Sequence, residues 1–316
     1  MSGPPEPAPL PGKAAVSHVR VGVGLLLGVV AVLVILLDGL LGTREAFRAA
    51  APGTGLLLAL LSAAAMKECG DMLRGAGVES IPGYGALASF SILAARALLP
   101  VLGMRSGDAA AFAGAALLLA ILAPAAVAIA VKPKEGEGTG LPGPSAVRPL
   151  AGTALTLLIV HVPMAMLLEL RLVPPVPVMS SSVPSGLVLA AMVAIGCKVG
   201  DSAAYFAGRT IGKRPLCWVS PKKTWEGAVA GSLVGTAAAA TLGVLFGLPL
   251  RHGLAFGLVV NLAGQGGDLL ESWLKRCCGV KDSGSTFGEM GGALDLVDAL
   301  LLAGPAAYLF HRVVLA

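Results

Sequence analysis

Apolar runs close to the length that crosses a bilayer as a helix recur through most of this chain, and they constrain its fold more than any other feature. Hydrophobic residues make up 56% of the chain, far more than the core of a soluble domain requires. We therefore expect an all-α, polytopic integral membrane protein with about nine transmembrane helices. The nine expected spans are 19–37, 53–66, 84–103, 108–131, 149–169, 186–206, 227–247, 252–267 and 291–311.

The expected domain organisation follows from these runs. Residues 1–17 are rich in Pro and Ala and are predicted to form a disordered tail. The first apolar run is long for the core of a signal peptide, so we expect it to be retained as a span. Residues 18–316 are then predicted to form a single membrane-embedded domain.

Lysine and arginine are distributed unevenly among the expected loops. With a cytoplasmic N-terminus, fifteen of the 23 lie in the tail and the even-numbered loops, six lie on the opposite side and two lie inside spans. Cytoplasmic loops retain positive charge, so we expect a cytoplasmic membrane protein whose polar site faces the cytoplasm. Because the basic residues occupy short loops between spans, the net charge of +5 indicates contact with membrane lipids and no nucleic acid partner.

Residues 268–298 gather nine charged side chains of both signs in a chain that is only 13% charged. Asp295 and Asp298 are three residues apart and would share one helix face. Asp268 closes the eighth expected span, with Glu271 one turn later on the same face. If the last two spans pack together, Asp268, Asp295 and Asp298 converge. Clustered carboxylates with all-oxygen chemistry suit Mg²⁺, so these three are the predicted metal ligands.

Several basic residues accompany these acids in the expected cytoplasmic loops. Lys and Arg beside magnesium-binding carboxylates could neutralise the phosphates of a nucleoside triphosphate. Taken singly, such residues more often anchor helices to lipid headgroups, but anchoring does not account for acids on two adjacent spans. Lys198 and Asp201, three residues apart, are more readily interpreted as a structural ion pair than as catalytic groups. The basic residues that accompany the predicted magnesium ligands are Lys222, Lys223, Lys275, Arg276 and Lys281.

The stretch "ESWLKRCCGVKDSGSTFGEMGGALDLVD" resembles the C-terminal signature of the CDP-diacylglycerol synthases, also called phosphatidate cytidylyltransferases. The upstream stretch "GDSAAYFAGRTIGKRPLCWVSPKKTWEG" is similar to the other cytoplasmic block of that family, including its Ser-Pro-Lys-Lys-Thr-x-Glu-Gly run. The resemblance covers residues 196–300, and before them it rests on the span pattern and on Glu68. Two positions depart from the family: Met290 stands where it has His, and Leu296 where it has Arg.

The resemblance implies transfer of a cytidylyl group from CTP to phosphatidate, giving CDP-diacylglycerol and pyrophosphate for phospholipid synthesis. Residues 196–300 would form the catalytic part, with Mg²⁺ as cofactor; a homodimer is left open. The implied catalytic residues are Asp268, Asp295, Lys275 and Lys281, and the implied substrate-binding residues are Lys222, Lys223, Arg276, Ser220, Thr224, Arg209 and Asp282. Asp201 and Glu226 are further candidates.

Two alternatives stay open at this point. The lipid phosphate could be a different one, such as an isoprenoid ether lipid. Alternatively, the chain could be a non-catalytic or transport paralogue that uses the same acids for an ion, since the departures at Met290 and Leu296 are compatible with lost chemistry.

Overall fold

The computed structural model describes residues 34, 38, 50–130, 144–179, 183–288 and 291–316, and over these the chain is helical. The strand-like feature within them is one isolated antiparallel bridge between Pro215 and Thr224. The expected all-α fold is therefore confirmed for this part of the chain. The predicted tail, nearly all of the first expected span and the departure at Met290 lie outside the described residues.

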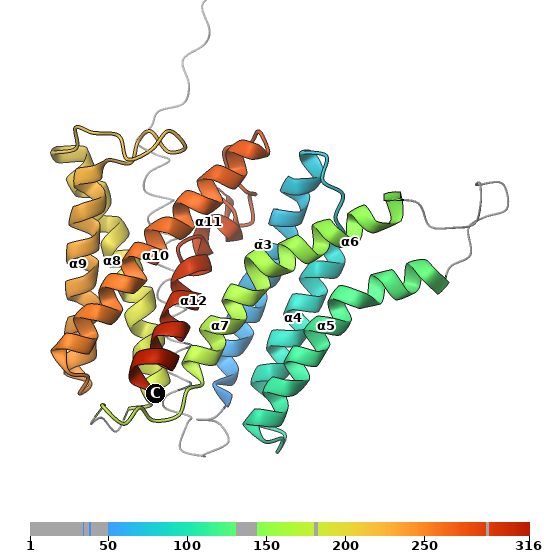
Figure 1. Cartoon of the computed structure of the whole chain (residues 1–316), viewed down its shortest axis with the longest axis horizontal. Helices are drawn as coiled ribbons and strands as arrows, with labels where there is room; N and C mark the ends of the chain where they lie inside the picture. Colours follow the sequence, from blue (N-terminus) through green and yellow to red (C-terminus); the bar gives the residue numbers. More distant parts are fainter. Residues whose placement is uncertain (1–33, 35–37, 39–49, 131–143, 180–182, 289–290) are drawn as a thin grey trace, which may run out of the picture.

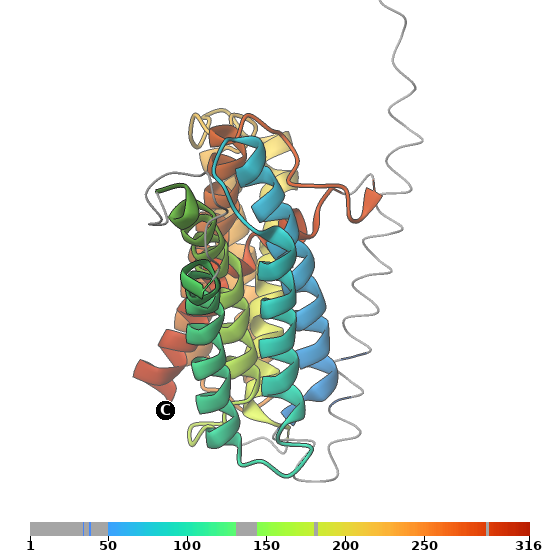
Figure 2. The same ribbon diagram turned by 90° about the vertical axis from the view of Figure 1, so that its right-hand side faces the viewer.

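The helices form one bundle whose members run roughly along a common direction (Figures 1 and 2). Eight of the nine expected spans, the second to the ninth, coincide with helical segments. The segments are α3 (Pro52–Gly75), α4 (Pro82–Leu98), α5 (Ser106–Ala130), α6 (Pro144–Thr156), η1 (Leu157–His161), α7 (Val162–Arg171), α8 (Ser185–Thr210), α9 (Trp225–Leu245), α10 (Leu250–Cys277), α11 (Ala293–Val297), α12 (Leu300–Phe310) and η3 (His311–Leu315).

Five stretches of the described chain are long and apolar enough to cross a membrane. Helices α3, α4 and α10 match expected spans in position but are not both long and apolar enough. The predicted count of nine transmembrane spans is therefore not reproduced. The five stretches are Ser106–Ala123, Val147–Arg171, Ser185–Thr210, Trp225–Leu245 and Ala293–Leu315.

Two helices extend well past the apolar runs that predicted them. Helix α3 continues to Gly75, and its added turns carry an i,i+4 ion pair in which Lys67 Nζ lies 2.8 Å from Asp71. Helix α10 continues from the expected end at residue 267 to Cys277. Charged residues do not by themselves end a helix. The extension of α10 places Asp268, Glu271 and Lys275 on consecutive turns of one helix.

Small residues bring α8, α9 and α10 close together. A Cβ atom added at Gly235 of α9 would lie 2.6 Å from the carbonyl oxygen of Gly196 on α8 and would also overlap Asn261 of α10. Gly231 approaches the carbonyl oxygen of Gly200 in the same way. Such close helix contacts are typical of membrane proteins, where packing replaces the hydrophobic effect between helices.

The loops gather at two ends of the bundle. The α8–α9 connection and the C-terminal end of α10 lie at one end, which we call the loop end (Figure 1). The α4–α5 turn and the C-terminus lie at the other, the opposite end. At that opposite end, Arg96 of α4 forms an ion pair with Glu169 of α7, with N–O distances of 2.5 and 2.9 Å. The charged residues predicted for the site lie at the loop end.

Candidate active site

The α8–α9 connection, residues 211–224, folds back on itself before α9 begins. Trp225 N–H donates to Arg214 O at 3.0 Å, and Leu216 N–H to Lys223 O at 2.8 Å. Thr224 caps α9, since its hydroxyl accepts from Gly227 N–H at 3.1 Å. The Ser-Pro-Lys-Lys-Thr run therefore ends in a helix cap, which fixes Lys223 just before the first turn of α9.

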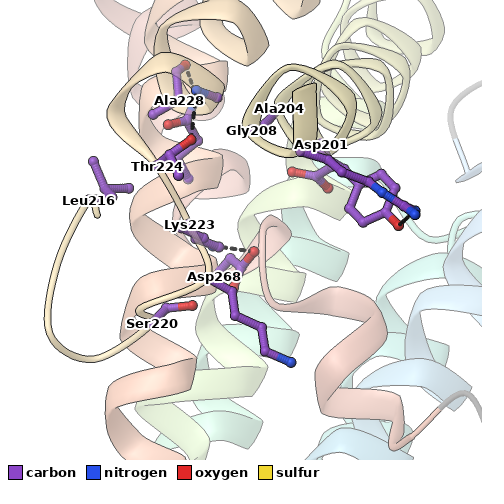
Figure 3. A pocket seen from close by; sticks show the side chains of 14 residues that line it. Asp201, Ala204, Gly208, Leu216, Ser220, Lys223, Thr224, Ala228 and Asp268 are labelled. Carbon is purple, nitrogen blue, oxygen red and sulfur yellow. Dashed lines mark hydrogen bonds and ion pairs between the residues drawn. The ribbon is translucent and has the colours of Figure 1, made fainter. Parts of the chain in front are cut away.

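A cavity of about 610 Å³ opens between this connection and the adjoining ends of α8, α9 and α10 (Figure 3). Lys223 reaches into it from the connection, and its Nζ lies 2.5 Å from Asp268 Oδ2 of α10. Asp201 of α8 lies across the cavity, and the predicted structural ion pair is present, with 3.9 Å between Lys198 and Asp201. The lining also includes Arg209, Ser220, Lys222, Thr224, Tyr205 and Gln265.

Three carboxylates meet where α10 packs beside the start of the last helical segment. One oxygen each from Asp268, Glu271 and Asp298 lies within 4.8 Å of the other two. Glu271 is only 2% exposed, and its Oε1 has no hydrogen-bond partner among the described residues. A buried carboxylate oxygen left without a partner is costly, so the donor set fits a divalent cation bound by oxygen ligands.

Lys275 and Asp295 adjoin this cluster. Lys275 Nζ lies 2.7 Å from Glu271 Oε2 and 2.6 Å from Asp295 Oδ1. The pKa of Glu271 is raised to about 8: burial raises it most, the nearby Asp295 carboxyl also raises it, and Lys275 lowers it. For Lys275, burial lowers the pKa, but its contacts with Asp295 and Glu271 outweigh burial and leave it above its ordinary value. Lys275 therefore offsets the charge of Glu271 and Asp295, while Lys223 offsets that of Asp268.

The segment after α10 is held by two carboxylates on different helices. Asp295 accepts hydrogen bonds from the N–H groups of Gly292 at 2.7 Å and Ser283 at 3.3 Å. Glu68 of α3, far away in sequence, accepts from Ser283 Oγ at 3.3 Å and Leu294 N–H at 3.0 Å. The described residues of this segment, 280–288 and 291–294, are called the signature loop below.

The structure brings together most of the residues selected from the sequence, but in two groups. The cavity holds Arg209, Ser220, Lys222, Lys223, Thr224 and Asp268. Asp298 lies with Asp268 as predicted, whereas the partner nearest Asp295 is Lys275. Arg276, Lys281 and Asp282 are exposed beyond this cavity, and Arg276 donates to Val280 O at 3.2 Å. Their roles, like the metal role of Asp295, stay predictions.

Two further residues enter the site without having been selected as ligands or catalytic groups. Glu271 completes the carboxylate cluster with Asp268 and Asp298. Its spacing of three from Asp268 placed it on the same face, which was the available signal. Glu68 contacts Ser283 and Leu294 of the signature loop, which lie 215 and 226 residues later in the sequence. Periodicity within either segment gives no information on that pairing, because it is a tertiary contact.

Comparison with known proteins identifies the family. A model of the "Cytidylyltransferase family" matches residues 18–314, nearly the whole chain. The chain belongs to the cytidylyltransferase family.

Similar family members include proteins from plants and bacteria. The chain is 42% identical over 130 residues to phosphatidate cytidylyltransferase 5, chloroplastic, from Arabidopsis thaliana, covering 40% of this chain and 32% of that protein. It is 42% identical over 115 residues to a phosphatidate cytidylyltransferase from Brucella suis, and 39% identical over 119 residues to one from Aquifex aeolicus. Each of these two covers 36% of this chain and 43% of the relative. The matched part thus spans less than half the length of these relatives.

Proposed function

We propose that this protein transfers a cytidylyl group from CTP to phosphatidate, giving CDP-diacylglycerol and pyrophosphate. The observation that carries the proposal is the pairing of Lys223 with Asp268, which joins the cavity to the carboxylate cluster in a member of the cytidylyltransferase family. The names of the relatives supply the lipid substrate. The proposed partners of the protein are CTP, phosphatidate and membrane lipids. A homodimer stays a prediction, and so does the absence of a nucleic acid partner.

The chemistry asks the protein for positioning and charge neutralisation more than for a strong base. A phosphatidate oxygen, already anionic near neutral pH, attacks the α-phosphorus of CTP, and the bond to pyrophosphate breaks. Lys222, Lys223 and Arg209 bind the phosphates that enter the cavity and offset their charge. Ser220 and Thr224 provide hydroxyl groups at the same wall. Lys275 holds Glu271 and Asp295 in place behind it.

Magnesium is the proposed cofactor. Asp268, Glu271 and Asp298 would hold it, and Asp295 would contribute through its contact with Lys275. When bound, the ion neutralises charge on the phosphates and fixes their orientation. Arg276, Lys281 and Asp282 are proposed to meet the lipid headgroup or the triphosphate outside the cavity. The proposed catalytic role of Lys281 is to contact the phosphates from the signature loop.

The membrane arrangement is part of the same proposal. Residues 1–17 form a tail, residues 18–316 form a single membrane-embedded domain with about nine spans, and residues 196–300 form its catalytic part. The loop end faces the cytoplasm from the cytoplasmic membrane, where CTP is available. The acyl chains of phosphatidate stay among the apolar helices while the phosphate reaches the cavity. The excess of Lys and Arg at the loop end supports this orientation.

The test is pyrophosphate release by the purified protein in detergent. The complete reaction contains CTP, phosphatidate and Mg²⁺, and each is omitted in turn. The variant Asp298→Asn is expected to lose at least about a hundredfold in turnover, because it removes a cluster carboxylate without changing size. Asp71→Asn, which neutralises an exposed acid of α3, is the matched control and should retain activity.

The outcomes separate the alternatives. Release that requires all three components establishes the proposed reaction. Release with a different lipid phosphate in place of phosphatidate would reassign the lipid. Full turnover in the Asp298→Asn variant would contradict the metal assignment, and no release with any lipid phosphate, from protein with its native thermal transition, would contradict the enzymatic function.

A further inference from the structure

The buried carboxylate of Glu68 is not used by the proposed reaction. Glu68 lies within α3 and is 7% exposed, and no Lys, Arg or His forms an ion pair with it among the described residues. Burying a carboxylate is costly unless an opposite charge or several hydrogen bonds stabilise it. In this fold the stabilisation comes from hydrogen bonds, and their donors all belong to residues 283–294.

Both oxygens of Glu68 accept hydrogen bonds from the signature loop. Oε1 accepts from the hydroxyl of Thr286 at short range and from its N–H at 3.4 Å. Oε2 accepts from Ser283 Oγ at 3.3 Å and from Leu294 N–H at 3.0 Å. A Cβ atom added at Gly284 or Gly292 would overlap the Glu68 carboxyl group, so a side chain at either position would displace it. The loop is thus shaped around this one carboxylate.

The contacts lead directly to the candidate active site. Leu294, whose N–H reaches Glu68, precedes Asp295 in the chain. Asp295 accepts from Ser283 N–H on the other side of the loop and contacts Lys275, which in turn contacts Glu271 of the carboxylate cluster. The loop is therefore fixed between two acids, one on α3 and one at the start of α11.

We infer that Glu68 is a positioning residue: it fixes the signature loop from α3 and so sets the place of Asp295 and Lys275 beside the carboxylate cluster. Every hydrogen bond of its carboxyl group among the described residues is one that it accepts. Glutamine would retain the shape but turn an N–H₂ group toward the N–H and O–H donors of the loop. The kinetic consequence rests on the proposed function, whereas the structural one does not.

The experiment compares Glu68→Gln with Glu169→Gln in the full-length protein in detergent. Glu169 is the matched control, since it is also paired within the bundle but at the opposite end. Amide hydrogen exchange of residues 283–294 is expected to rise in Glu68→Gln and to stay unchanged in Glu169→Gln. At a temperature below both thermal transitions, Glu68→Gln should lower kcat about tenfold to a hundredfold, and Glu169→Gln by less than about twofold.

A second variant approaches the contact from the loop. Ser283→Ala combined with Thr286→Val removes two hydroxyl donors and leaves α3 unchanged. We expect a similar rise in exchange, a smaller loss of kcat, and little additional loss when it is combined with Glu68→Gln, because the three residues act through one contact. The loop variant also decides the question if Glu68→Gln does not fold.

Unchanged exchange at residues 283–294 in the Glu68→Gln variant, or an equal loss of kcat in both glutamine variants, would overturn the inference. If the unmodified protein released no pyrophosphate, the proposed function would fail while the exchange measurement still decided the role of Glu68.

Discussion

Two different ligands would compete with the ion pair between Lys223 and Asp268. Its Nζ neutralises Asp268, one of the three carboxylates of the cluster, while its position in the cavity wall suits a phosphate. A divalent cation at the cluster would compete with Lys223 for Asp268 and free the ammonium group for the incoming nucleotide. Binding of the ion and binding of the triphosphate are then coupled through one side chain.

Replacing Lys223 by Ala is therefore expected to act differently on the two ligands. The KM for CTP should rise about tenfold, since a charge-assisted hydrogen bond to phosphate is lost. In the absence of CTP, divalent-metal binding should become tighter, because Asp268 no longer has an ammonium partner. Steady-state kinetics and titration with Mn²⁺ monitored by electron paramagnetic resonance would measure the two effects.

Lys213→Ala is the matched control for this variant. Lys213 is an exposed residue of the same connection and does not line the cavity. Both constants should stay within about twofold of the unmodified protein. If Lys223→Ala changed neither the KM for CTP nor the affinity for Mn²⁺, its phosphate-binding role would be wrong.

At the scale of elements, small residues allow close packing of α8, α9 and α10, the three helices that line the cavity. Gly235 faces the backbone of Gly196 on α8 and the side chain of Asn261 on α10. Asn261 is buried and donates to Gly257 O at 2.8 Å, so its position is fixed within its own helix. The close packing of these three helices sets the spacing between the carboxylates of α10 and the cavity residues of α8.

Gly235→Ala should destabilise the protein by about 1–3 kcal/mol, since an added methyl group has to separate packed backbones. Gly114→Ala on α5 is the control: no atom lies within 4 Å of its added Cβ, and alanine favours the helix. Thermal unfolding in detergent would measure both, and equal stability of the two variants would contradict the close packing of α8 with α9.

Sequence patterns predicted the helices well and their ends less well. Apolar runs located eight helical segments, because an apolar segment of this length satisfies its backbone polar groups internally as a helix. The apolar runs missed the extensions of α3 and α10, since their charged residues carry no hydropathy signal even though they are helical. The expectation that the last two spans pack together correctly brought Asp268 and Asp298 into one cluster. It could not show that Asp295 faces Lys275, because that choice depends on how α11 packs.

At the scale of the whole molecule, the separation of loops into two ends predicts how the protein lies in a membrane. Cys277 is exposed near the loop end, and Arg105 is exposed in the α4–α5 turn at the opposite end. In sealed right-side-out vesicles, an impermeant thiol reagent should label a single cysteine introduced at position 105. It should label Cys277, kept as the single native cysteine, only after the membrane is opened. The reverse pattern would contradict the cytoplasmic placement of the site.

The contact between Glu68 and the signature loop has a consequence for exchanging parts between relatives. Residues 196–300 carry the recognisable motifs, yet the shape of their loop is completed by a side chain from α3. A chimera that takes only residues 196–300 from one relative would combine its signature loop with the α3 helix of another. We therefore expect α3 and the signature loop to be exchangeable only together, because they are in contact although they are far apart in the sequence.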